Sequence, residues 1–381
     1  MDAHRTSSPA PSAGGRIEPR RCTLTAALHP DRSDAHAQTA ASDTLAGMSS
    51  ETADTVRLHV QPCTQIIPFW HIDTPPGITA EIRVRAAAEV TGAFSDWVTV
   101  ASWSSQGTGE STTLTAQQVH GLRTDADTVI VDTAALGGPA RLVDLAVRAV
   151  PAARAAAAPV TVHWIDALTR TPARPRAEIT ASAPRGIDIE HRLPQISQHA
   201  CGVLDGFAQA DSWCSPTSLT MVMEWLSAGG AHAELDAHAV SPPAGEDAAD
   251  RVHPTIRGVW DRTYGGAGNW AFNVAWANGQ GFNARLDALY SMREAEELLA
   301  AGEVLIASVS FTSEQLPQAG YPTAGHLLII TGVTTAGDVR VHDPGRAIAD
   351  GVRAVYPREA FERAWLSAEG SGGLVYRLAR R

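Results

Sequence analysis

The sequence contains no lysine, and all 30 of its basic residues are arginine. This absence excludes a Walker A phosphate loop, a pyridoxal Schiff base and any lysine nucleophile. The formal net charge is -11, whereas a protein that follows a nucleic-acid backbone needs a basic surface. We therefore expect neither a lysine-dependent enzyme nor a nucleic-acid partner.

Cysteines are also few, and long apolar runs are missing. The four cysteines, Cys22, Cys63, Cys201 and Cys214, are far apart and form no CxxC pair. This spacing indicates neither a zinc site nor a disulfide framework, so we expect no metal, no other cofactor and at least one thiol that is free to react. No stretch of about 18 apolar residues occurs, so no integral membrane segment is predicted.

The first 50 residues lack aromatic residues altogether and lack the apolar core of a secretory signal. They are rich in Ser, Ala, Pro, Asp and Arg, a composition typical of disorder. We interpret residues 1–50 as a disordered tail or a misplaced start, with Met48 as the alternative first residue. The chain as written is predicted to be cytoplasmic, and secretion is the alternative.

Residues 51–172 have the pattern of an all-β domain. Segments such as "AEIRVRA" and "DWVTVASW" alternate apolar and polar residues, which is typical of half-buried strands. Six or seven such segments occur between residues 55 and 170, so we predict a β-sandwich. Residues 173–189 are rich in Pro, Ala and Arg and are predicted to be a linker.

Residues 190–381 mix helical and strand patterns and are predicted to form an α+β domain, in which an N-terminal helix packs on an antiparallel sheet. The first helix is predicted over residues 216–227, with Ser215 as its cap. A second helix is predicted over residues 291–302, beginning at a serine cap and ending at a glycine. The apolar face of the first helix consists of Leu219, Val222, Met223 and Leu226.

A cysteine, a histidine and an aspartate form a candidate catalytic set. Cys214 stands at the N-terminus of the first helix, where the dipole and unpaired N–H groups favour a thiolate. A hairpin is predicted from strands over 327–333 and 339–341, which brings His326 and Asp343 to the same open end. The carboxylate can orient the imidazole, and the imidazole can serve as the base. The alternatives are a structural thiol, a core histidine and a turn aspartate.

Gln198 lies upstream of Cys214 and could direct its amide at the same oxyanion as the Cys214 N–H. In the order Gln, Cys, His, Asp, the segments "LPQISQ", "WCSPTSLTMVMEW", "GAGNWAFNVAWANGQGFNARL", "GHLLIITGV" and "VRVHDP" resemble papain-fold peptidases of cysteine-peptidase family thirty-nine. That family includes the bacteriocin-processing peptidases and stand-alone actinobacterial relatives with a preceding β-sandwich. The resemblance covers residues 190–381. It implies a papain-like fold with Cys214 as nucleophile, His326 as base, Asp343 as orienting acid and Gln198 as oxyanion donor.

Two departures from the family pattern limit what the resemblance implies. Gln198 lies farther from Cys214 than in the bacteriocin-processing branch, and the chain has no fused membrane transporter. Cleavage coupled to export is therefore in doubt, and the substrate of that branch does not transfer.

Two tryptophans are candidate substrate-binding residues. Trp270 follows a glycine-rich loop whose spacing fits neither a Walker A nor a dinucleotide motif, and we interpret the loop and the next helix as one wall of the substrate cleft. Core packing is an equal alternative for Trp270. Trp213, directly before Cys214, is the second candidate.

The first functional hypothesis is a cysteine peptidase that hydrolyses peptide bonds through an acyl-enzyme, with a peptide or protein as its substrate. The second is an amidase or acyl-transfer enzyme that acts on cell-wall peptides with the same nucleophile. The third is a non-catalytic protein that binds a glycan or a peptide. The sequence predicts no oligomeric state.

Overall fold

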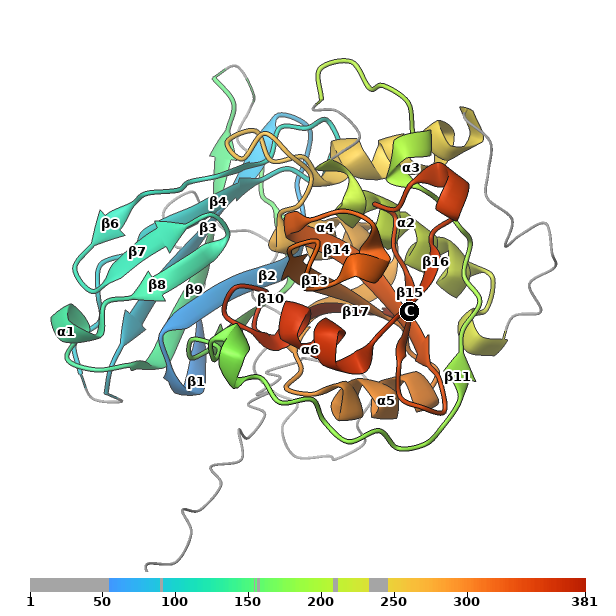
Figure 1. Cartoon of the computed structure of the whole chain (residues 1–381). Helices are drawn as coiled ribbons and strands as arrows, with labels where there is room; N and C mark the ends of the chain where they lie inside the picture. The colour runs from blue at the N-terminus through green and yellow to red at the C-terminus, as the bar shows by residue number, and fades with distance from the viewer. Residues whose placement is uncertain (1–54, 90–91, 154, 156–157, 208–211, 233–245) are drawn as a thin grey trace, which may run out of the picture.

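The computed structural model describes residues 55–381 except 90–91, 154, 156–157, 208–211 and 233–245. The predicted tail 1–50, with Cys22 and Met48, lies outside these residues. Within them, no helix combines the length and apolar character needed to cross a membrane. Figure 1 shows a strand-rich part, coloured blue to green, beside a mixed part of helices and strands that runs to red.

The strand-rich part consists of two antiparallel five-stranded sheets, with the orders β1-β9-β3-β4-β5 and β10-β2-β8-β7-β6. In β3 every second residue from Ile78 to Ala86 is buried, as a period of two predicts. The described residues contain more strands than the six or seven predicted, because two-residue strands such as β5 and β6 show no periodicity. The strands are β1 Thr55–Cys63, β2 Gln65–Asp73, β3 Ile78–Ala87, β4 Val98–Trp103, β5 Thr112–Thr113, β6 Gln118–Val119, β7 Leu122–Asp125, β8 Thr128–Val131, β9 Ala140–Pro151 and β10 Thr161–Arg170, with helix α1 Thr133–Leu136 between β8 and β9.

The mixed part contains a seven-stranded sheet with the order β12-β17-β13-β14-β15-β16, and β11 pairs with β14. Its pairs are antiparallel. The helices are α2 Cys214–Ser227, α3 Glu246–Val259, α4 Trp270–Gly279, α5 Met292–Ala300 and α6 Arg358–Leu366; the strands are β11 Ile189–Glu190, β12 Phe282–Ala288, β13 Leu305–Phe311, β14 Thr323–Val333, β15 Val339–His342, β16 Arg353–Tyr356 and β17 Leu374–Arg380; short 3-10 helices occur at η1 Arg176–Glu178, η2 Gln198–Ala200, η4 Gly230–His232, η5 Pro317–Ala319 and η6 Ile348–Asp350.

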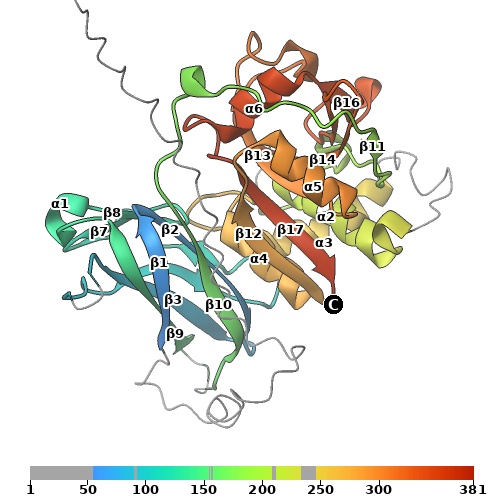
Figure 2. The same ribbon diagram turned by 90° about the horizontal axis from the view of Figure 1, so that it is seen from below.

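Helices cover both faces of this sheet. Ile306 of β13 packs in one apolar cluster with α2, α3 and α4, whereas its neighbours Leu305 and Ala307 pack in another with α5 and α6. Figure 2 shows α5 and α6 on one side and α2, α3 and α4 on the other. A strand covered on both faces lacks regular apolar–polar alternation, which agrees with the largely apolar run "LIASVSF". The prediction of an α+β domain is confirmed.

The cores of the two parts join across α4. Phe272 of α4 lies edge-on to Trp70 of β2, with ring centroids 6.0 Å apart, and its ring centroid is 5.5 Å from that of Trp103. The Asn278 side chain donates to Trp70 O at 3.4 Å. Buried aromatic pairs of this kind stabilise an interface beyond the area they bury. The strand-rich part is therefore fixed against one specific helix of the mixed part.

Candidate active site

Cys214 is the first residue of α2, not a residue before it. The predicted cap was wrong: Trp213 precedes the helix without a capping side chain, and Ser215 lies inside it. The Ser215 hydroxyl is 3.1 Å from Tyr376 Oη instead. The thiol is therefore closer to the free N–H groups of the first turn than the sequence implied, which favours its ionised form.

His326 lies within β14, which begins at Thr323, three residues earlier in the chain. Two bonds hold this strand against α2: the Leu327 N–H donates to Cys214 Sγ at 3.5 Å, and the Ser218 hydroxyl donates to Leu327 O at 3.2 Å. The contact brings His326 to Cys214. Both side chains are largely buried, with exposed fractions of 4% and 8%.

Asp343 follows β15 and is fully buried. Its Oδ1 lies 2.7 Å from His326 Nε2, so the other ring nitrogen, Nδ1, is left for Cys214. The carboxylate also accepts from Tyr321 Oη at 2.7 Å, from Tyr356 Oη at 2.5 Å and from the Gly345 N–H at 2.9 Å. Four donors fix its position, and a buried carboxylate with this many partners can stay ionised.

The pKa values of the three groups are coupled. Burial, the strongest influence on Cys214, raises its pKa, but the charge and hydrogen bond of His326 outweigh burial and leave the pKa lowered. Burial likewise opposes the charged form of His326, yet Asp343 and Cys214 raise its pKa well above the ordinary imidazole range. Against burial, His326 and the two tyrosines lower the pKa of Asp343. The geometry thus favours a thiolate beside an imidazolium, with an ionised carboxylate behind it.

Tyr321, Tyr356 and Gly345 are site residues that the sequence did not reveal. Burial, followed by the charge of Asp343, raises the pKa of both phenols, so they remain hydrogen-bond donors. The Tyr321 ring also meets His326 edge-on, with centroids 5.5 Å apart. A Cβ at Gly345 would lie 2.8 Å from His326 Cε1 and 2.8 Å from Tyr321 Oη. Only the position of this glycine in "HDPG", two residues after the candidate aspartate, could have indicated it.

Gln198 lies in η2, beside the candidate set. Its backbone N–H donates to Pro344 O at 3.0 Å, and the Ile196 N–H donates to Met221 Sδ of α2 at 3.3 Å. The segment therefore connects Pro344, the residue after Asp343, with α2, the helix that begins at Cys214. The Gln198 side chain is 4% exposed, and its Oε1 has no hydrogen-bond partner among the described residues.

Comparison with known families agrees with this arrangement. Residues 192–372 match the Peptidase_C39 like family, and residues 12–169 match the Peptidase C39 N-terminal domain. The mixed part belongs to the C39-like peptidase family. No curated protein matches the chain. A solved structure described as a C39-like peptidase from Bacillus anthracis is similar, with 15% identity and a TM-score of 0.30 over 51% of this chain and 98% of the other. A TM-score this low adds nothing to the family assignment.

The two candidate tryptophans have different surroundings: Trp213 is buried, and Trp270 is half-buried. Trp213 is fully buried, and its ring packs edge-on to His253 with centroids 5.7 Å apart. This corrects its prediction as a substrate-binding residue, because a ring with no exposed surface cannot contact a substrate. Trp270 begins α4 and contacts the strand-rich part: its backbone N–H donates to Asp127 Oδ2 at 3.0 Å, and the Arg170 guanidinium lies 6.0 Å from its ring centroid.

Asp261 ties a loop of the C39-like domain to the strand-rich part. Its fully buried carboxylate accepts from the N–H groups of Thr113, Thr263 and Tyr264 and from the Asn269 amide, at 3.0 to 3.3 Å. A further bond joins the same two segments: the Arg262 N–H donates to Ser111 O at 3.0 Å. Asp261 Oδ1 thus accepts from Thr113 of β5 in the strand-rich part and from Thr263 and Tyr264 in a loop of the C39-like domain.

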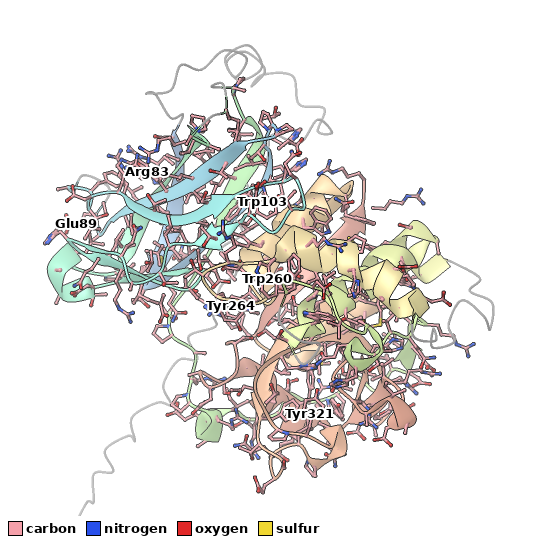
Figure 3. The ribbon with its side chains drawn as sticks, turned by 90° about the horizontal axis from the view of Figure 1, so that it is seen from above. Arg83, Glu89, Trp103, Trp260, Tyr264 and Tyr321 are labelled. Carbon is pink, nitrogen blue, oxygen red and sulfur yellow. The ribbon has the colours of Figure 1, made fainter. Side chains whose placement is uncertain are left out.

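The same loop carries an exposed tyrosine at the junction of the two parts. Tyr264 is 62% exposed, and Figure 3 shows it with Trp260 where the two parts meet. Burial of its hydroxyl, and then the charge of Cys214, raise the pKa of Tyr264. A residue of the strand-rich part, Thr113, therefore helps to position the loop that carries Tyr264.

A cavity of about 1060 Å³ opens at the end of β13 and the beginning of β14. It is lined by Arg176, Ala177, Ser310, Phe311, Thr312, Gln315, Pro322, Thr323, Ala324, Arg363 and Glu369. Neither Cys214 nor His326 lines it.

Proposed function

We propose that this protein is a cysteine peptidase in which Cys214 attacks a peptide carbonyl. The observation that carries the proposal is the buried series from Cys214 through His326 to Asp343, with 2.7 Å between His326 Nε2 and Asp343 Oδ1. Membership of the C39-like peptidase family supports the same reaction class. We also propose that the C39-like domain is papain-like and spans residues 190–381, with a linker at 173–189 and a β-sandwich at 51–172.

In the proposed reaction the Cys214 thiolate adds to the carbonyl carbon, and the carbonyl oxygen becomes an oxyanion. The Cys214 N–H and the Gln198 side-chain amide donate to that oxyanion. His326 gives its proton to the leaving amine as the C–N bond breaks, which leaves a thioester. His326 then takes a proton from water, the hydroxide attacks the thioester, and the carboxylic acid and the thiolate are released.

Asp343 holds the imidazole for both proton transfers. Its carboxylate fixes the ring so that Nδ1 faces Cys214, and its charge keeps His326 protonated until the amine leaves. The phenols of Tyr321 and Tyr356 satisfy the other carboxylate positions. The strand-rich part supports the site indirectly, because its Thr113 shares Asp261 with the loop that carries Tyr264.

Thiol alkylation tests the proposed nucleophile without a known substrate. Burial raises the pKa of Cys63 to about 12 and that of Cys201 to about 11, whereas that of Cys214 is lowered. At neutral pH iodoacetamide should therefore label Cys214 far faster than the other two, as measured by peptide mass mapping over time. The variant His326→Ala should abolish the difference. Equal rates for Cys63, Cys201 and Cys214 in the unmodified chain would refute the proposal.

Digestion of a peptide library with the full chain tests the reaction itself, with Cys214→Ala as the matched control. The proposal predicts cleaved peptides with free carboxylates, and no cleavage by the control. The masses of the products also separate hydrolysis from acyl transfer, since transfer to an amine leaves a new amide in place of the carboxylate. If Cys214 is labelled rapidly but only transfer products form, Cys214 is the nucleophile and the protein is an acyl-transfer enzyme, not a peptidase.

A further inference from the structure

A second cluster of reactive side chains lies in the strand-rich part. His71 and Asp73 come from β2 and His163 from β10, and one ligand atom of each lies within 4.8 Å of the others. His71 is buried, with 5% of its surface exposed, whereas the side chains of His163 and Asp73 are 40% and 53% exposed. The cluster is therefore buried at His71 and open to solvent at His163 and Asp73.

The backbone brings these three side chains together. His71 and Asp73 are alternate residues of one strand, so they point to the same face of the sheet. On β10 the register shifts between Val162 and Trp164, which pair with Ile72 and His71. His163 is the extra residue of this bulge. A bulge redirects a side chain, and here His163 Nε2 comes to 2.8 Å from Asp73 Oδ2, with its ring stacked on His71 at 3.9 Å.

A cation already lies against His71. The Arg381 guanidinium is 3.0 Å from His71 Nδ1 and donates to Asn278 O at 2.9 Å. The same guanidinium nitrogen is 3.4 Å from His71 Nε2, so it lies over the imidazole ring and leaves the in-plane lone pair free. Two imidazoles and a carboxylate are donors that zinc prefers.

We propose that His71, Asp73 and His163 form a zinc-binding site, with solvent completing the coordination. Zinc bonds to N and O atoms are about 2.0 to 2.2 Å long, so tetrahedral ligand atoms lie about 3.4 Å apart, and the widest separation in the cluster must contract by up to about 1.4 Å. The stacked rings, 14° from parallel, must also open, because parallel rings cannot aim lone pairs at one ion. His163 and Asp73 are exposed enough to make both movements. The positive charge of Arg381 beside His71 opposes zinc binding.

Calorimetric titration with Zn²⁺ tests this site in the full chain, after treatment with a chelator. The background is Cys214→Ser, which removes a thiolate that would itself bind zinc. We expect His163→Ala and Asp73→Asn each to weaken the proposed site at least about 100-fold, because each removes one of three ligands. The matched control is His120→Ala, an exposed histidine of the same part, and it should leave the affinity unchanged.

Arg381→Ala gives the result that a damaged fold cannot imitate. Removal of this guanidinium should tighten Zn²⁺ binding about tenfold, because a positive charge beside the ion is lost. A thermal melt of each variant without metal checks that it is folded. Affinity that is equal in the background and in His163→Ala would overturn the proposal. So would a background chain that takes up no zinc.

Discussion

The substitution Gly345→Ala tests whether the position of His326 limits the reaction. The new Cβ would lie 2.8 Å from His326 Cε1 and from Tyr321 Oη, about 0.6 Å less than the 3.4 Å at which ordinary contacts begin. Both neighbours are packed, and Tyr321 is bonded to Asp343, so the imidazole must shift. Misplacement by about 1 Å can reduce a rate about 100-fold. We expect kcat/KM to fall by about 10- to 100-fold, or about 1.4 to 2.7 kcal/mol.

The matched control for this substitution is Gly325→Ala, next to His326 in the chain. A Cβ at Gly325 meets nothing within 4 Å, so its kcat/KM should stay near that of the unmodified protein. Overpacking at Gly345 costs about 1 to 3 kcal/mol of stability, so thermal melts must show that the variant is folded at the assay temperature. If folded Gly345→Ala keeps its full kcat/KM, the imidazole is not held as tightly as we argue.

Three further predictions concern the oxyanion donor, the ion pair and the tie between the two parts. Gln198→Ala should lower kcat about 100-fold, and an unchanged kcat would show that another group stabilises the oxyanion. Because the pKa of Cys214 is lowered and that of His326 is raised, kcat/KM should be bell-shaped: it falls in acid below the ordinary thiol range as the thiolate is protonated, and in base above the ordinary imidazole range as His326 loses its proton. A single rise near about pH 8.5 would contradict the ion pair. Asp261→Ala leaves four donors unpaired and should reduce the free energy of unfolding by about 3 kcal/mol in urea denaturation, and a change below about 0.5 kcal/mol would mean that water replaces the carboxylate.

The hairpin could be predicted from the sequence because its signals are local. A run of apolar residues, a turn at Gly337 and a second short run determine the pairing, and the pairing brings positions 326 and 343 to one end. In the structure β14 and β15 pair around that turn, with Val333 opposite Val339. The bond between His326 and Asp343 follows from this pairing. The pairing of the hairpin strands was therefore enough to predict that His326 and Asp343, two of the three candidate residues, lie close together.

The support around Asp343 could not be predicted in this way. Tyr321 and Tyr356 lie in segments before and after the hairpin, 22 and 13 residues from Asp343. Neither sits in a pattern that distinguishes it from an ordinary core tyrosine, since a phenol that binds a carboxylate and one that binds a carbonyl have the same neighbours in sequence. For Trp213 the sequence suggested a role that the structure does not support. Its place next to Cys214 suggested contact with substrate, but its side chain is fully buried.

The division of the chain into two parts, although visible in composition, is not a division of the apolar core. The linker and the change in periodicity are local features, whereas the bond from Thr113 to Asp261 joins residues 148 positions apart, and that from Asn278 to Trp70 joins residues 208 apart. Phe272 is fully buried, and Trp70 and Trp103 of the other part pack against its ring. If the C39-like domain were cut free, this ring would lose partners, and the Asp261 carboxylate would lose one of its four donors, the Thr113 N–H. The loop that carries Tyr264 would also lose the bond from the Arg262 N–H to Ser111 O.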